Sequence, residues 1–230
     1  MKKSLLLICL LLLPALIYIF FATGRHNKKE LPIFFNEGVQ TNVVDGKEQT
    51  DSVYHTIPPF NFINQDGIIV TEKDFENKIY AADFFFTTCP TICPKMMTQM
   101  QRVDSMTKQL YDFMIISHSV NPSHDSVPVL ADYAKRVHAD SKKWMLVTGG
   151  KKDIYDIGID GYKLAVDEDP RAPGGFLHSE MFVLVDKQKR IRGYYDGTDS
   201  AAVRTMIEDV IMLSAEYEKK NREPKIYQKH

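Results

Sequence analysis

The hydrophobic residues of this chain form one long run near the start and a series of short clusters further along. The run covers residues 4–23 and contains no charged side chain. About 20 apolar residues are enough to span a lipid bilayer. A secretory signal peptide has a shorter apolar core, about 7–15 residues, followed by small residues at a cleavage site. Because residues 19–24 (IFFATG) make a poor cleavage site, the pattern favours a retained membrane anchor over residues 1–24.

The charges beside this run give mixed information about its orientation in the membrane. Lys2 and Lys3 precede it and favour a cytoplasmic N-terminus, but Arg25, Lys28 and Lys29 follow it closely. An uncleaved signal sequence usually leaves the long C-terminal part outside, and we expect that arrangement here. In a bacterium the chain would then be a single-pass protein of the inner (cytoplasmic) membrane. Its domain would face the periplasm, where disulfide chemistry is permitted.

Polar and apolar residues then divide the rest of the chain into three parts. Residues 25–57 are mostly polar with little periodicity, which predicts an extended lead-in to a domain. The folded domain is expected over residues 58–220, and residues 221–230 are predicted to form a polar tail.

The first clusters of the domain predict a hairpin, a short helix and a buried strand. Residues 60–63 and 68–70 flank the sequence NQDG, which favours a tight turn because Asp-Gly tolerates positive φ. Residues 71–74 (TEKD) resemble a capping box at a helix start. The run 79–86 is apolar except for Asp83, so it predicts a buried central strand.

The remaining clusters alternate between helical and strand-like spacing. Helices are predicted over about 96–108, 126–138, 154–157 and 200–220, and strands over 113–120, 144–147, 161–166, 181–185 and 191–195. The last two strands flank a polar turn at 186–189 and predict a second hairpin. This order of elements predicts an α/β domain with a central mixed sheet flanked by helices.

Composition and charge limit the classes of function that the chain can have. Hydrophobic residues are 44% and charged residues 26% of the chain, as in a globular protein. The formal net charge of −1 argues against a nucleic-acid-binding protein. Cys9 lies within the apolar run, behind residues too bulky for a lipidation motif, and is interpreted as an apolar residue in lipid. With only Cys89 and Cys93 left, the domain is not a disulfide scaffold, and the pair points to chemistry.

The surroundings of this pair favour a reactive or metal-binding site. Cys89 follows the predicted central strand, and Pro90 suits the first position of a helix. We therefore expect Cys89 at a helix N-terminus, where the dipole stabilises a thiolate, and Cys93 one turn further on the same face. Cβ atoms at this spacing lie about 5–6 Å apart, so a modest distortion permits a disulfide. The two sulfurs could also hold Cu(I), or Cu(II) with an added imidazole.

The motif FFFTTCPTICPKM at residues 84–96 strongly resembles the Sco/SenC family of copper-binding assembly proteins for cytochrome c oxidase. The resemblance covers roughly residues 57–213. Further matches are residues 121–125, 132–136, 144–149, 178–179 and 192–198. The resemblance implies a thioredoxin-like fold and one copper ion bound by Cys89, Cys93 and a distant histidine, His178.

One part of the family motif differs in this chain. The usual Asp-Pro-x-x-Asp reads NPSHD, so Asn121 replaces the first acid, while Asp125 remains as a helix-cap candidate. Six other histidines have no such support as ligands; among them His118, at the end of a predicted strand, is interpreted as structural. Helical spacing makes Met96, Met97, Met100 and Met106 core residues rather than extra ligands.

The resemblance implies a membrane-anchored copper chaperone that passes copper to the copper-site subunit of cytochrome c oxidase, in exchange with other copper chaperones or thiol reductants. A thiol–disulfide oxidoreductase would use the same pair, with Cys89 as the attacking thiolate, and both roles can coexist on one site. A peroxiredoxin-like peroxidase is disfavoured because no arginine is near Thr88 in the sequence. Neither leading interpretation requires a conventional enzyme.

Overall fold

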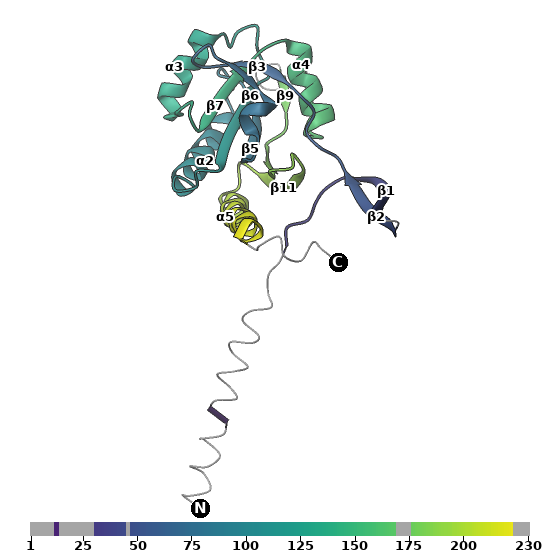
Figure 1. Cartoon of the computed structure of the whole chain (residues 1–230). Helices are drawn as coiled ribbons and strands as arrows, with labels where there is room; N and C mark the ends of the chain where they lie inside the picture. Colours follow the sequence, from purple (N-terminus) through teal and green to yellow (C-terminus); the bar gives the residue numbers. More distant parts are fainter. Residues whose placement is uncertain (1–11, 14–29, 45–46, 169–175, 223–230) are drawn as a thin grey trace, which may run out of the picture. The chain divides into compact units, whose positions relative to one another are not determined.

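The computed structural model describes residues 12–13, 30–44, 47–168 and 176–222 (Figure 1). The chain divides into two compact units, Met1–Leu31 and Pro32–His230. Within the described residues no helix is both long and apolar enough to cross a membrane. The anchor predicted over 1–24 falls almost entirely outside the described residues, as does most of the tail predicted over 221–230.

The second unit is built on a seven-stranded mixed sheet. Its spatial order is β11 (Ile191–Asp196), β10 (Met181–Val185), β5 (Ile79–Phe85), β6 (Phe113–Ser119), β7 (Trp144–Thr148), β3 (Asn61–Asn64) and β4 (Ile69–Thr71). The strands β5, β6 and β7 run parallel, and their other neighbours are antiparallel. The predicted mixed sheet is therefore confirmed, with the expected central strand as β5.

Helices cover both faces of this sheet (Figure 1). The helical elements are η1 (Glu72–Phe75), α2 (Cys93–Met106), α3 (Val127–Val137), α4 (Lys151–Asp156), the π-helix η2 (Ile157–Gly161) and α5 (Ser200–Arg222). Successive strand residues point to opposite faces. Phe85 stacks on Tyr133 of α3, with ring centroids 5.4 Å apart, whereas Phe84 lies 5.8 Å from Tyr162, which follows η2. Every residue of β5 is consequently buried, which explains its nearly unbroken apolar sequence.

Local signals in the first hairpin and helix are confirmed. β3 and β4 pair antiparallel, and Gly67 in their connection has φ of +76°, a conformation that favours glycine. Thr71 caps η1: its hydroxyl accepts a hydrogen bond from the Lys73 amide, and Asp74 accepts one from the Thr71 amide at 2.7 Å. This is the predicted capping box.

The lead-in predicted over 25–57 is not simply extended. Its second half forms an antiparallel pair, β1 (Asn36–Val44) with β2 (Lys47–Tyr54). Val39 and Val43 on β1 are 70% and 71% exposed, so the hairpin buries neither of these side chains. Without a buried face the sequence shows no polar–apolar alternation, and this is why the pattern missed the two strands.

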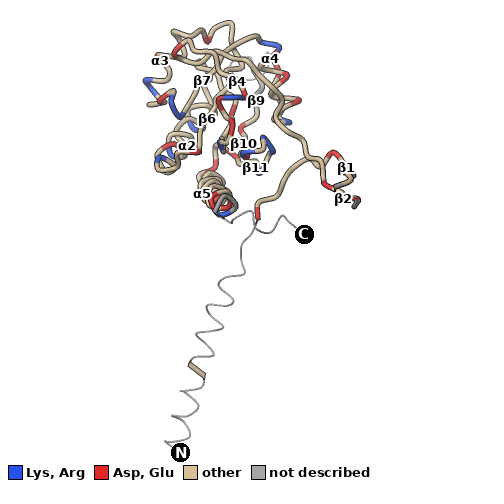
Figure 2. Tube along the Cα trace, in the orientation of Figure 1, with Lys and Arg blue, Asp and Glu red and all other residues tan. Residues whose placement is uncertain are grey.

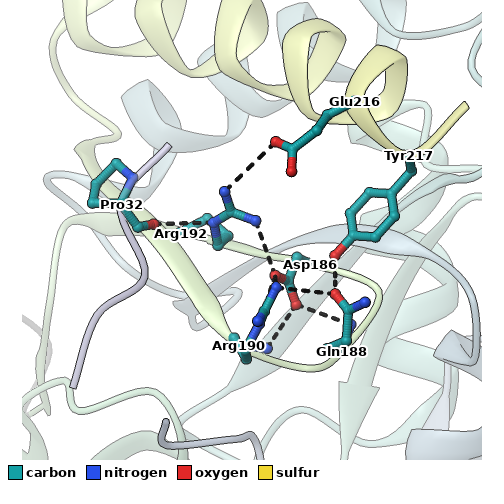
Figure 3. A network of polar contacts seen from close by, with 7 residues as sticks. All are labelled: Pro32, Asp186, Gln188, Arg190, Arg192, Glu216 and Tyr217. Atoms are coloured by element: carbon teal, nitrogen blue, oxygen red, sulfur yellow. Dashed lines mark hydrogen bonds and ion pairs between the residues drawn. The ribbon is translucent and has the colours of Figure 1, made fainter. Parts of the chain in front are cut away.

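The base of the lead-in is fixed to the edge of the main sheet by a buried polar network (Figure 3). Arg192 of β11 donates from Nε to the Pro32 carbonyl oxygen at 3.0 Å. Its guanidinium also lies 3.0 Å from a carboxylate oxygen of Asp186 and 3.8 Å from Glu216 of α5. Asp186 is buried and accepts a second ion pair from Arg190 at 2.7 Å. The network joins the start of the unit to β11 and the last helix.

The segment after η2 also differs from the prediction. The strand predicted over 161–166 begins later, as β8 (Val166–Glu168), and pairs antiparallel with β9 (Phe176–His178), which the sequence did not predict. Residues 169–175 between them lie outside the described residues.

Figure 2 shows acidic and basic residues interspersed along the helices, in keeping with the balanced net charge.

Candidate functional site

The two cysteines lie where the central strand meets α2, but the helix begins later than predicted. After β5 the chain turns, with the Cys89 amide donating to the Phe86 carbonyl at 3.2 Å, and α2 starts at Cys93. Pro94, rather than Pro90, occupies the first-turn position that suits proline. Cys89 therefore precedes the helix, and Cys93 is its first residue.

The N-terminus of α2 nevertheless stabilises negative charge on the Cys89 sulfur. The Cys93 amide, the first in the helix, donates a hydrogen bond to the Cys89 sulfur at 3.4 Å. An amide in this position has no partner within the helix, and it stabilises negative charge on the sulfur. Cys89 is 9% exposed and Cys93 only 1% exposed, and no disulfide joins them. Cys89 is consequently the sulfur that an incoming partner meets first.

The inner thiol is held in its protonated form. A hydrogen bond to Cys89, followed by burial, raises the pKa of Cys93 well above the ordinary value of a thiol. The negative charge of Asp83, which is fully buried in β5, acts in the same direction. The reduced pair therefore keeps a proton on Cys93, and either a disulfide or a metal–sulfur bond at that atom must release it.

Asp125 positions the loop before the cysteines, which corrects its predicted role as a helix cap. The fully buried carboxylate accepts hydrogen bonds from the Thr87 amide at 3.0 Å and the Thr87 hydroxyl at 2.5 Å. It also accepts from the Ser119 hydroxyl at 2.6 Å and from His124 Nδ1 at 2.8 Å. Ser126 is the N-cap residue of α3. The carboxylate thus joins the end of β6 to the cysteine loop.

Replacing Asp125 by asparagine should lower the free energy of unfolding by about 3 kcal/mol, because an amide NH₂ then faces donors in a buried site. Loss of the Thr87 contacts should also speed alkylation of Cys89 by iodoacetamide. Urea unfolding and the alkylation rate measure the two effects. The matched change Asp132→Asn, at an exposed carboxylate on α3, should leave both values unchanged. Equal behaviour of the two variants would contradict the positioning role.

The third predicted ligand, His178, is the last residue of β9, where it pairs with Val166. The structure describes its backbone but not its side chain. One contact places β9 beside the cysteine loop: the rings of Phe176 and Phe86 lie 5.2 Å apart. Among the side chains that are described, no group of three His, Cys, Asp or Glu residues is arranged to hold a metal ion. The ligand set of Cys89, Cys93 and His178 stays a prediction.

His118 and most of the methionines have structural positions, in agreement with their interpretation. His118 is fully buried, stacks on Phe84 with centroids 5.0 Å apart, and lies 3.3 Å from the Tyr162 hydroxyl through Nε2. Burial lowers the pKa of His118 to about 3. Three methionines of α2 are buried, whereas Met106 is 62% exposed and is not a core residue. The buried three are Met96, Met97 and Met100.

A mixed sheet with a cysteine pair directly after its central strand is the arrangement of a thioredoxin-like domain that handles thiols or metals. Residues 48–214 match the SCO1/SenC family, and the chain belongs to that family. Comparison with solved structures leads to the same family. A SCO1/SenC family lipoprotein from Bacillus anthracis is 30% identical, with a TM-score of 0.65 over 70% of this chain and 95% of that chain.

Two further solved structures are similar. BsSco, described as a member of the Sco family of cytochrome c oxidase assembly proteins with a disulfide switch, is 30% identical, with a TM-score of 0.62 over 70% of this chain and 94% of its own. Bradyrhizobium japonicum ScoI, solved with copper bound, is 21% identical, with a TM-score of 0.58 over 69% of this chain and 99% of its own, and shows the shared fold. The predicted family and the thioredoxin-like α/β fold are confirmed, whereas the N-terminal transmembrane helix stays a prediction.

Proposed function

We propose that this chain is a membrane-anchored copper chaperone that binds one copper ion through Cys89, Cys93 and His178. The observation that carries the proposal is the contact between Phe86 and Phe176. It brings the strand that ends in His178 alongside the loop that contains Cys89 and leads to Cys93 at the start of α2. Two sulfurs and an imidazole, drawn from separate parts of the sequence, can then meet at one end of the sheet.

The chemistry of these donors fits copper as a cargo. Thiolates are soft ligands that favour Cu(I), and an added imidazole suits Cu(II). The pair sits in a nearly closed environment, since Cys93 is 1% exposed and Cys89 is 9% exposed, and Cys89 is the more exposed of the two. Such an arrangement can retain a copper ion and still release it to a partner that approaches from the Cys89 side.

Family membership supports the proposed acceptor. BsSco is described as a cytochrome c oxidase assembly protein, and B. japonicum ScoI holds copper. We therefore propose delivery to the copper-site subunit of the oxidase. The apolar residues 4–23 would hold the chain in the cytoplasmic membrane, with the domain on the periplasmic face, where other copper chaperones or thiol reductants exchange with it.

A second function, thiol–disulfide exchange, is favoured by the amide that faces the Cys89 sulfur. Cys89 thiolate would attack a partner's disulfide and form a mixed disulfide. Cys93, after losing its proton to solvent, would displace the partner as a thiolate and leave a Cys89–Cys93 disulfide. Two electrons pass to the partner, which ends as a dithiol. The disulfide switch described for BsSco supports disulfide chemistry in this family.

Replacing His178 by alanine separates the two functions. If His178 is a copper ligand, the variant should bind Cu(II) at least about tenfold more weakly and with a changed visible absorption spectrum. The rate at which the reduced variant exchanges with a model peptide that contains a disulfide should not change. The matched control His138→Ala, at the exposed end of α3, should resemble the parent in both respects. An unchanged Cu(II) affinity and spectrum in His178→Ala would remove His178 from the site.

A further inference from the structure

His124 lies close to the cysteine loop, although no motif assigned it a role. The strands β5 and β6 are parallel neighbours, with Phe85 opposite Ser119, so the segments that follow them leave the sheet at the same edge. His124 is five residues beyond the end of β6. Its Nδ1 lies 3.4 Å from the Thr87 hydroxyl, and Thr87 precedes Cys89 by two residues.

The imidazole of His124 is held in one orientation by a buried partner. Nδ1 lies 2.8 Å from an Asp125 carboxylate oxygen; the Asp125 side chain is 0% exposed and the His124 side chain 50% exposed. Asp125 also accepts the three bonds from Thr87 and Ser119. A carboxylate in this role only accepts, so Nδ1 of His124 carries the hydrogen.

This assignment leaves the other ring nitrogen available. With the hydrogen on Nδ1, the Nε2 atom of a neutral imidazole has a lone pair for a metal ion. A buried carboxylate behind the ring fixes the tautomer and increases the basicity of the coordinating nitrogen, as it does at many metal sites. An ordinary surface histidine has neither advantage. His55 also contacts a carboxylate, but its partner Glu37 is 55% exposed, whereas the partner of His124 is fully buried.

We propose that Nε2 of His124 is a docking ligand that first receives copper and then yields it to the cysteine pair. The inference rests on the proposed copper function and adds a residue outside the three-ligand set. In the transfer the bond from copper to Nε2 breaks as bonds from copper to Cys89 and Cys93 form. The thiol protons pass to solvent, and the oxidation state of the metal does not change. The transfer requires little conformational change, because Asp125 and Thr87 already hold the His124 ring beside the cysteine loop.

The test compares the rate and the extent of copper loading in the full chain in detergent. Cu(II) is supplied as its glycine complex, and stopped-flow absorbance follows the sulfur-to-copper charge-transfer band. His124→Ala should load roughly tenfold more slowly than the parent, with the same final stoichiometry. The control His138→Asn, which preserves a residue tolerant of the left-handed φ of 54° at that position, should load at the parental rate.

A second measurement removes the sulfurs and examines the docking site alone. In Cys89→Ser/Cys93→Ser protein, electron paramagnetic resonance at one equivalent of Cu(II) should show a nitrogen-coordinated species that decreases when His124→Ala is added. Equal loading rates for His124→Ala and parent, or a paramagnetic spectrum indifferent to His124, would overturn the proposal. Failure of the parent itself to load copper at the cysteines would instead overturn the proposed function.

Discussion

Serine in place of Cys93 is expected to weaken copper binding by more than about a hundredfold. The substitution removes one of the two soft donors and leaves a hydroxyl, a poor ligand for Cu(I). Cys93 is also the residue at which α2 begins, so its sulfur is fixed by the helix backbone. Competition with a copper(I) chelator of known affinity measures the loss in the reduced full chain.

Cys9 provides the matched control, because it is the third cysteine and lies in the apolar run. Cys9→Ser should bind copper with the parental affinity and a stoichiometry of one ion per chain. Circular dichroism of Cys93→Ser should match the parent, since a serine hydroxyl fits the space of a thiol. Parental copper affinity in a folded Cys93→Ser protein would show that the metal lies elsewhere.

Acidification from pH 7 to pH 5 is expected to lower the free energy of unfolding by about 2 kcal/mol through His118 alone. Burial lowers the pKa of His118 to about 3 in the folded chain, whereas an unfolded histidine has a pKa of about 6.5. The unfolded state therefore binds more protons as the pH falls below about 6.5, and stability decreases. The loss increases as the pH falls and is complete only below the folded-state pKa.

Urea unfolding of the copper-free, reduced protein between pH 5 and pH 7 measures this effect. His118→Leu should be less stable than the parent at pH 7, because it loses the contact with Tyr162, but its stability should change less with pH. Removing the exposed His138 instead should leave the parental pH dependence in place. A His118→Leu protein with the same slope as the parent would mean that His118 is not the group responsible.

The sequence predicted those parts of the fold in which a short segment determines its own structure. The capping box at Thr71, the turn at Gly67 and the buried strand β5 all depend on neighbouring residues, and all three are confirmed. The central strand was recognisable because helices cover both of its faces and leave no polar positions. The sequence itself placed the cysteine pair directly after that strand, and family resemblance added the expected copper role.

The remaining features depend on contacts between distant residues. Two Cys-Pro pairs follow β5, and local preference alone does not decide whether the helix starts at Pro90 or one turn later at Cys93. The role of Asp125 depends on Thr87, which is 38 residues away, and was therefore invisible as a local pattern. Among the strands that the structure describes, the short β9 pairs with β8 alone, so its strand character comes from that partner.

The same reasoning explains why His124 did not stand out. A histidine followed by an aspartate is a common sequence, and the pair becomes informative only when the aspartate is buried and its other contacts are known. The structure supplies both facts. By contrast, His178 was identified by family resemblance and its place beside a strand, and the contact between Phe86 and Phe176 adds a physical reason for β9 to lie near the cysteine loop.

The central claim is that Cys89, Cys93 and His178 together bind one copper ion. X-ray absorption at the copper edge tests it most directly, on full-length protein loaded with one equivalent of Cu(II), alongside the His178→Ala variant. The account predicts two sulfur donors and an imidazole in the parent, and two sulfur donors without that imidazole in the variant. A parent spectrum with fewer than two sulfurs, or an imidazole contribution that persists in His178→Ala, would contradict it.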